Sequence, residues 1–141
     1  MENPLLELQE YENLQEALKK AKGPVQATGT LDSQKVHLMY WLGKDGGFPW
    51  KLVVTYDDQR AREIYDDFRS FTENVWLYPA KDLLFYSADI HGNLMTRQRI
   101  AVWRHLMEEE EGVVVTTLDG LMDHLLPLVF LKQQVVTVEN G

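Results

Sequence analysis

Apolar positions in the first 23 residues follow the period of an amphipathic helix. They recur three or four positions apart, at Leu5, Leu8, Tyr11, Leu14, Leu18 and Ala21. The pattern ends at Lys22-Gly23-Pro24, where a basic last turn, a glycine and a proline together are typical of a helix end. We therefore predict an N-terminal helix within residues 1–23, followed by a separate unit that spans residues 24–141.

From residue 24 onward, short apolar runs typical of strands alternate with segments of helical period. The predicted strands are residues 25–28, 51–56, 75–78, 113–117 and 134–138. The predicted helices begin near residue 32 and then cover about 59–71, 94–107 and 118–126, while residues 81–92 are predicted to be irregular. This alternation favours a parallel sheet, because parallel neighbours need crossover connections that lay helices on the sheet. The predicted fold class is α/β, with a mostly parallel sheet between two layers of helices.

Two pairs of polar residues are predicted to cap helices. Asp32 and Ser33 stand at the start of the second helix, and Asp57 and Asp58 at the start of the third. Side-chain oxygens of Asp and Ser accept hydrogen bonds from the unpaired N–H groups of a first helical turn. Asp57 and Asp58 also suit a phospho-acceptor at the carboxyl end of a strand, as in a receiver domain. That site needs acidic residues just after the first strand, and residues 28–30 supply none.

Residues 25–36 lie where a nucleotide-binding fold carries its phosphate loop, between a strand and a helix. Such a loop, G-x-x-x-x-G-K-[ST], uses glycine backbone and a lysine to hold phosphates, and a hydroxyl to hold Mg²⁺. Here one glycine remains, valine follows the lysine, and an aspartate would stand beside any phosphate. The degenerate loop consists of Thr28, Gly29, Thr30, Asp32 and Lys35. We expect no nucleotide cofactor, and we expect the Asp32 carboxylate to cap the next helix where a phosphate would otherwise bind.

Composition narrows the possible functions. Lysine and arginine number 14 against 22 acidic residues, a net charge of −8 that opposes a broad DNA-binding surface. The chain has no cysteine, which excludes disulfides and thiolate metal sites and fits a reducing compartment. No signal sequence is visible, and no apolar run approaches the ~20 residues of a membrane helix. We expect a cytoplasmic protein with no membrane partner.

Few residues suggest catalytic or metal chemistry. The histidines, at positions 37, 91, 105 and 124, form no H-x-x-x-H pair, so no metal site is predicted. No serine lies in a G-x-S-x-G elbow, and the four tryptophans are expected in core or rim packing. The basic cluster is Arg97, Arg99 and Arg104. Arg97 and Arg104 share a helix face, whereas Arg99 is expected to tie its helix to the loop near Asp82 or Asp89 rather than to bind phosphate.

A set of short motifs occurs in a specific order between residues 24 and 141. The motifs are Gly29 after a strand, Leu52-Val-Val-Thr-Tyr-Asp-Asp58 with Ala61 and Phe68-Arg-Ser-Phe71, Tyr78-Pro-Ala-Lys-Asp82 with Tyr86, Arg99, and Gly112-Val-Val-Val-Thr-Thr-Leu-Asp-Gly-Leu-Met122 with Leu126-Pro127. In this order and spacing they resemble the N-terminal domain of the transcription-repair coupling factors (Mfd). That domain is similar to the first domain of excinuclease component B, which has a helicase-type fold, and its nucleotide loop is degenerate.

The resemblance implies a non-catalytic scaffold for transcription-coupled nucleotide excision repair of bacterial DNA damage. In that family, excinuclease component A binds mainly the adjoining domain, while RNA polymerase and DNA bind domains further along, so this chain is expected to be a fragment. Residues 78–95 are too short for the DNA-clamping hairpin of excinuclease component B, and Ser87 and Ile90-His91-Gly92 depart from the family pattern. Two other classes stay open: a self-standing nucleotide-binding enzyme that uses residues 28–35, and a receiver-type signalling domain.

Overall fold

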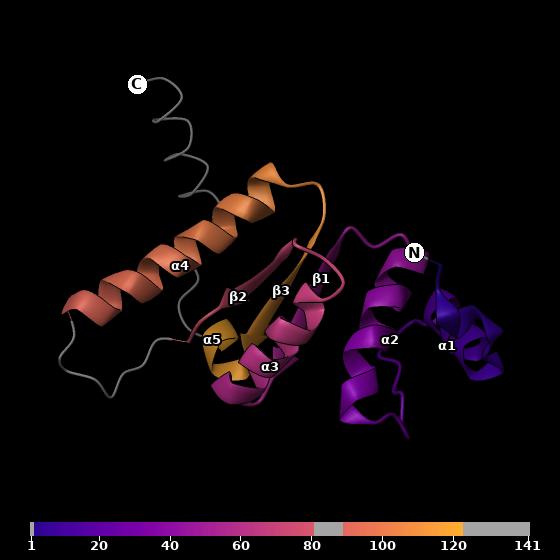
Figure 1. The fold of residues 1–141 in the computed structure, drawn as a ribbon. Coiled ribbons are helices and arrows are strands. Elements are labelled where there is room, and N and C mark those ends of the chain that lie inside the picture. The colour runs from indigo at the N-terminus through magenta and orange to yellow at the C-terminus, as the bar shows by residue number, and fades with distance from the viewer. Residues whose placement is uncertain (1, 81–88, 123–141) are drawn as a thin grey trace.

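A computed structural model describes residues 2–80 and 89–122 (Figure 1). In chain order the elements are the 3-10 helix η1 (Pro4–Glu7), α1 (Gln9–Lys20), α2 (Asp32–Asp45), β1 (Trp50–Thr55), α3 (Asp58–Arg69), β2 (Val75–Tyr78), α4 (Asp89–Glu108), β3 (Gly112–Thr117) and α5 (Leu118–Met122). The strand predicted at 134–138, the last part of the helix predicted at 118–126 and most of the irregular stretch at 81–92 lie outside the described residues. Residues 89–92 are helical rather than irregular. Helix α4 begins at Asp89, before residue 94, where the spacing of apolar residues predicted its start.

Three parallel strands form the described sheet, in the order β1-β3-β2. The register runs from Trp50 opposite Gly112 to Thr55 opposite Thr117 between β1 and β3. The strand β3, which is the last of the three described strands in sequence, therefore lies between the first two. Helix α3 connects β1 to β2 and helix α4 connects β2 to β3, as Figure 1 shows. The α/β class with a parallel sheet is confirmed.

Helices cover both faces of the sheet, which gives the three predicted layers. Strand residues alternate between the faces, so each strand contributes to two separate cores. The core on the α3 side contains Val36, Ala61, Ile64, Phe68, Val75, Val113 and Val115. The core on the α4 side is smaller and contains Tyr78, Val102 and Val114, with Trp50, Trp76, Trp103 and Leu106 packed against it. The two faces are therefore unequally filled.

Helix α3 begins as predicted. The Asp57 backbone is extended, and its Oδ1 accepts a hydrogen bond from the Arg60 backbone N–H at 2.7 Å. Asp57 is thus the N-cap, which confirms the capping role of this carboxylate. The apolar residues Ala61, Ile64 and Phe68 recur at helical spacing and are buried against the sheet.

The N-terminal region is two helices rather than one, and the break falls at Leu8, whose backbone is extended. Asn3 caps η1 through its Oδ1, which accepts from the Leu5 N–H at 2.8 Å. The Tyr11 hydroxyl donates to Asp45 Oδ2 at 2.6 Å, and Asn3 Nδ2 donates to the same oxygen at 2.5 Å. A continuous helix would separate positions 3 and 11 by about 12 Å along its axis. The break lets both side chains reach the carboxylate at the end of α2.

The prediction of a strand at residues 25–28 is wrong, because the chain between α1 and α2 contains neither strand nor helix. Val25 is half-buried, whereas the three residues after it are exposed. With two apolar side chains, Val25 and Ala27, this stretch has little surface to bury against a sheet. The degenerate loop therefore follows no strand of the described sheet.

Candidate functional site

The degenerate loop enters α2 through Gly29, which has a φ of 81°. This left-handed conformation favours glycine because other residues carry a Cβ. Leu31, rather than Asp32, is the N-cap of α2, and its backbone carbonyl accepts from the Gln34 N–H at 2.9 Å. The prediction that Asp32 caps this helix is therefore wrong. The helix starts one residue early, so Asp32 already occupies its first turn, whereas a capping side chain belongs to the extended residue before it.

The Asp32 carboxylate is instead a partner for the basic residues around it. Its Oδ1 lies 2.7 Å from Lys35 Nζ and 3.6 Å from Arg60 Nη2. The hydrogen bond from Lys35, with the positive charges of Lys35 and Arg60, lowers the pKa of Asp32. The Asp32 side chain is 70% exposed, so solvent screens these contacts. The lysine of the degenerate loop is nevertheless paired with the aspartate of the same loop.

A hollow of about 480 Å³ lies beside this loop, between α1, residues 25–30 and α2. Both threonines of the loop contribute to it: Thr30 is half-buried and Thr28 is exposed. Most of the wall is apolar, with Leu5, Leu8 and Leu14 on the α1 side. Among the described residues that line it, Glu10 is charged and none is a lysine or arginine. The described lining of the hollow therefore offers no permanently cationic side chain to a phosphate.

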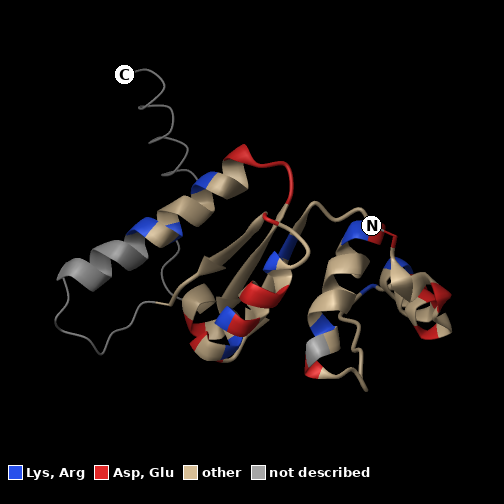
Figure 2. Cartoon of the chain, in the orientation of Figure 1, with Lys and Arg blue, Asp and Glu red and all other residues tan. Residues whose placement is uncertain are grey.

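The structure separates the three arginines of α4. Arg99 is 6% exposed; its Nε donates to the Pro79 carbonyl at 2.8 Å, and its guanidinium lies 5.0 Å from the centre of the Tyr78 ring. These contacts tie α4 to the end of β2, as expected of a structural residue. Asp82, one of the two partners considered, lies outside the described residues. Arg97 and Arg104 are exposed on the same helix, where Figure 2 shows basic positions along α4 and an acidic stretch at its end.

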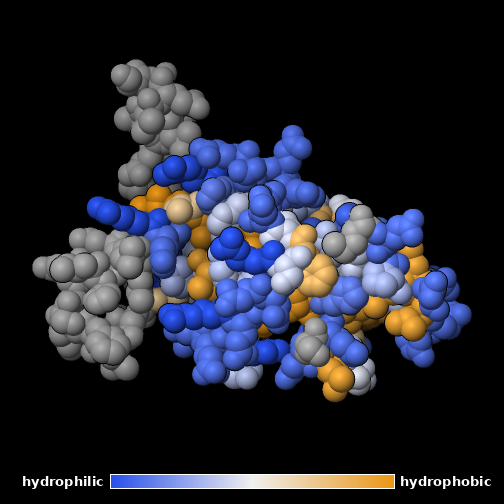
Figure 3. Space-filling view, in the orientation of Figure 1, coloured by the Kyte–Doolittle hydropathy of each residue, from blue (hydrophilic) through white to orange (hydrophobic). Residues whose placement is uncertain are grey.

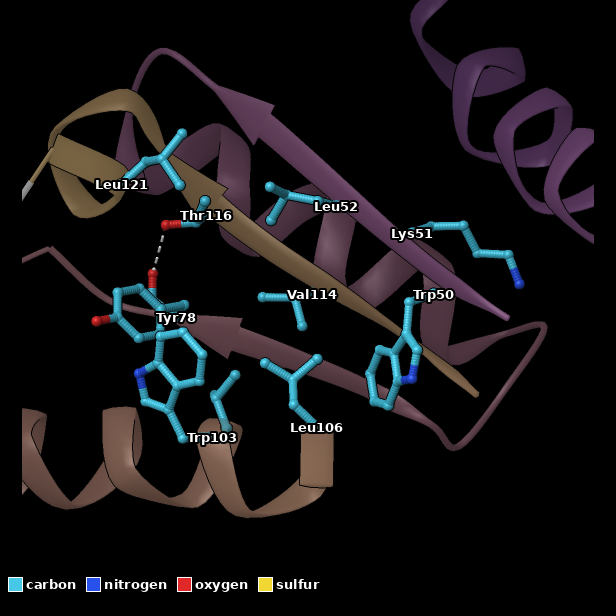
Figure 4. A pocket seen from close by; sticks show the side chains of 10 residues that line it. Trp50, Lys51, Leu52, Tyr78, Trp103, Leu106, Val114, Thr116 and Leu121 are labelled. Carbon is cyan, nitrogen blue, oxygen red and sulfur yellow. Dashed lines mark hydrogen bonds between the residues drawn. The ribbon is translucent and has the colours of Figure 1, made fainter. Parts of the chain in front are cut away.

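An apolar groove of about 330 Å³ opens on the α4 side of the sheet (Figure 4). It is lined by Trp50, Lys51, Leu52, Tyr78, Val102, Trp103, Leu106, Val114, Thr116 and Leu121. The Thr116 hydroxyl on the sheet floor is satisfied, since Thr116 Oγ1 donates to the Tyr78 carbonyl at 2.9 Å. The Lys51 side chain, the charged member of the lining, points away from the groove toward Gly43 of α2 (Figure 4), and burial there lowers its pKa. The groove is thus suited to an apolar occupant.

The groove exists because α4 covers the sheet unevenly. On the opposite face α3 packs against all three strands, whereas α4 packs mainly against β2. Leu52 and Val54 of β1 point to the α4 side and remain 58% and 42% exposed. On the face shown in Figure 3, hydrophobic atoms also gather beside α4. The sequence contained one signal for this face, the alternation of Trp50, Leu52 and Val54, but no signal for the placement of α4.

The tryptophans lie in core and rim positions, as expected. Trp41 is buried, and the other three are half-buried around the groove and its end. Within residues 2–80 and 89–122, no group of His, Asp or Glu is arranged to hold a metal ion. No helix in the same part of the chain is long and apolar enough to cross a membrane.

No model of a protein family, no curated protein and no solved structure matches the chain.

Proposed function

We propose that this chain is a non-catalytic scaffold and interaction domain of a bacterial transcription-repair coupling factor. Its role is to support recruitment of the nucleotide excision repair machinery to stalled RNA polymerase. The order of the motifs from Gly29 to Pro127, which resembles that family, motivates the proposal. The parallel α/β sheet is compatible with a domain related to a helicase-type fold.

The proposal that the domain is non-catalytic rests on the ion pair within the degenerate loop. Lys35 Nζ lies 2.7 Å from Asp32 Oδ1, and Arg60 also faces that carboxylate. A phosphate loop works by presenting a lysine and converging backbone N–H groups to the ligand. A nucleotide would have to displace Asp32 from both cations and would meet its negative charge. This arrangement supports a scaffold rather than a phosphoryl-transfer enzyme.

Titration calorimetry of the full 141-residue chain with Mg-ATP tests this part. We expect no binding heat from the wild type or from Lys35→Ala. Lys20→Ala on α1 is the matched control, because Lys20 is also an exposed lysine in an ion pair with an acid on its own helix. Micromolar binding that Lys35→Ala abolishes and Lys20→Ala retains would contradict the proposal and favour the self-standing nucleotide-binding enzyme.

Partner assays test the interaction part. We expect excinuclease component A to bind a chain that includes the adjoining domain and not residues 1–141 alone. Binding by residues 1–141 would place the contact in this domain instead, while failure of both chains would contradict the recruitment role.

DNA binding should be weak, because a net charge of −8 repels a polyanion. Fluorescence anisotropy of labelled DNA at low salt should stay flat on addition of the chain. Tight, salt-dependent binding that is lost on Arg97→Ala and Arg104→Ala would revive a direct role in DNA contact.

A further inference from the structure

The apolar groove beside α4 leaves large hydrophobic side chains in water. Leu52 is 58% exposed and Val54 is 42% exposed, both on β1, which is an edge strand of the described sheet. An exposed apolar edge strand favours aggregation, and proteins commonly cover such an edge. The groove is therefore expected to have an occupant in the folded chain.

Helix α5 brings the chain to the groove. It follows β3 directly, packs against β3 and β1, and places Leu121 in the groove lining, as Figure 4 shows. The described residues end one position later, at Met122, which is 77% exposed. Any segment that continues from Met122 therefore starts at the rim of the groove.

The sequence that follows has the composition to fill an apolar site. Residues 125–131 read Leu-Leu-Pro-Leu-Val-Phe-Leu and contain no charged residue. The groove lining consists of apolar and aromatic side chains apart from Thr116, whose hydroxyl is hydrogen-bonded, and Lys51, whose side chain points away toward α2. Burial of leucine, valine and phenylalanine against such a lining is favourable by roughly 25 cal/mol per Å² of apolar surface.

The length of the segment also fits. The groove extends from Leu121 near the carboxyl ends of the strands to Trp50 at the start of β1. A six-residue strand such as β1 is about 20 Å long, and nine residues after Met122 reach up to about 30 Å when extended. We propose that residues 125–131 of the same chain occupy the groove and cover Leu52.

Methyl NMR of the wild-type chain tests the proposal directly. Nuclear Overhauser effects are expected between the methyl groups of residues 125–131 and the Leu52 methyls or the Trp50 and Trp103 rings. An isotope-filtered experiment on a mixture of labelled and unlabelled chains separates contacts within one chain from contacts between two. Contacts within one chain support the proposal. Absence of these contacts, or contacts only between chains, overturns it and leaves the groove to a partner or a second copy.

A double-mutant cycle gives an independent test by melting temperature. Leu52→Asp should lower Tm by about 5 °C, because it puts a charge beneath the covering segment. Val129→Asp should have a similar effect, and the double variant should lose less than the sum of the two shifts. Leu6→Asp is the matched control: Leu6 is 54% exposed, on η1, and its replacement should change Tm little. Additive shifts at positions 52 and 129, or equal shifts at positions 52 and 6, would contradict the proposal.

Discussion

Gly112 offers a sharp test of how tightly the amino end of the sheet is packed. It is the first residue of β3, and it is buried between the rings of Trp50 and Trp76 on the flanking strands. A Cβ at this position would overlap Trp76 Cζ3 and would lie 2.7 Å from Trp50 Cζ3. The Trp76 ring in turn stacks on His105 of α4, with centroids 4.5 Å apart. The Gly112→Ala variant must therefore shift at least one ring, and a shift of Trp76 also disturbs α4.

Two terms of opposite sign set the size of the effect. Extra carbon atoms in a well-packed core cost about 1–3 kcal/mol, because side chains leave their preferred rotamers. Replacement of glycine by alanine also stabilises the folded state by about 0.5–1 kcal/mol, because alanine reduces the conformational freedom of the unfolded chain. The net expectation is a loss of about 1–2 kcal/mol in the free energy of unfolding. At about 3–4 °C per kcal/mol for a chain of this size, Tm should fall by roughly 3–8 °C.

Chemical and thermal denaturation measure this loss, and near-UV circular dichroism reports the tryptophan environment. Gly23→Ala is the control, because a Cβ at Gly23 meets nothing within 4 Å. We expect it to be neutral or slightly stabilising. If Gly112→Ala matches the wild type in stability and in near-UV signal, the close approach of the two rings to Gly112 is refuted.

Individual contacts give three further predictions. Asp57→Ala should lower the free energy of unfolding, measured by urea titration, by about 1 kcal/mol, because it removes the 2.7 Å hydrogen bond that caps α3. If the variant of the neighbouring residue, Asp58→Ala, loses as much stability, a specific capping role of Asp57 is contradicted. Arg99→Ala should cost about 2–3 kcal/mol by the same measurement, since it leaves the Pro79 carbonyl without its donor and removes the stack on Tyr78, whereas exposed Arg97→Ala should stay within about 0.5 kcal/mol. Burial and the bond to Asp45 raise the pKa of Tyr11 from its ordinary 10.0 to about 12, so its contribution to stability is present below pH 10 and is lost between pH 10 and 12. Denaturation across that pH range should show this loss in the wild type, and Tyr11→Phe should abolish that part of the slope.

Sequence patterns predicted the elements whose signals are local. The run from Trp50 to Thr55 is rich in β-branched residues and ends at a cap, so strand and helix boundaries were predictable there. The stretch at 25–28 has similar local signals yet joins no strand of the described sheet. The difference is that membership of a sheet depends on a partner edge and on enough buried surface, and neither is encoded within four residues.

The candidate site shows the same division between local and tertiary information. Sequence by itself determined that the loop at Gly29 lacks the glycines and hydroxyl of a phosphate loop, because those groups must occur at fixed spacing. It also determined the alternation that puts Leu52 and Val54 on one face of β1. Only the tertiary structure decided that Asp32 pairs with Lys35 and Arg60 instead of capping α2, because one of these partners belongs to another helix. The open groove also depends on tertiary packing, since α4 lies against β2 and leaves β1 exposed, and the position of a helix on a sheet follows from the fit of side chains distant in the sequence.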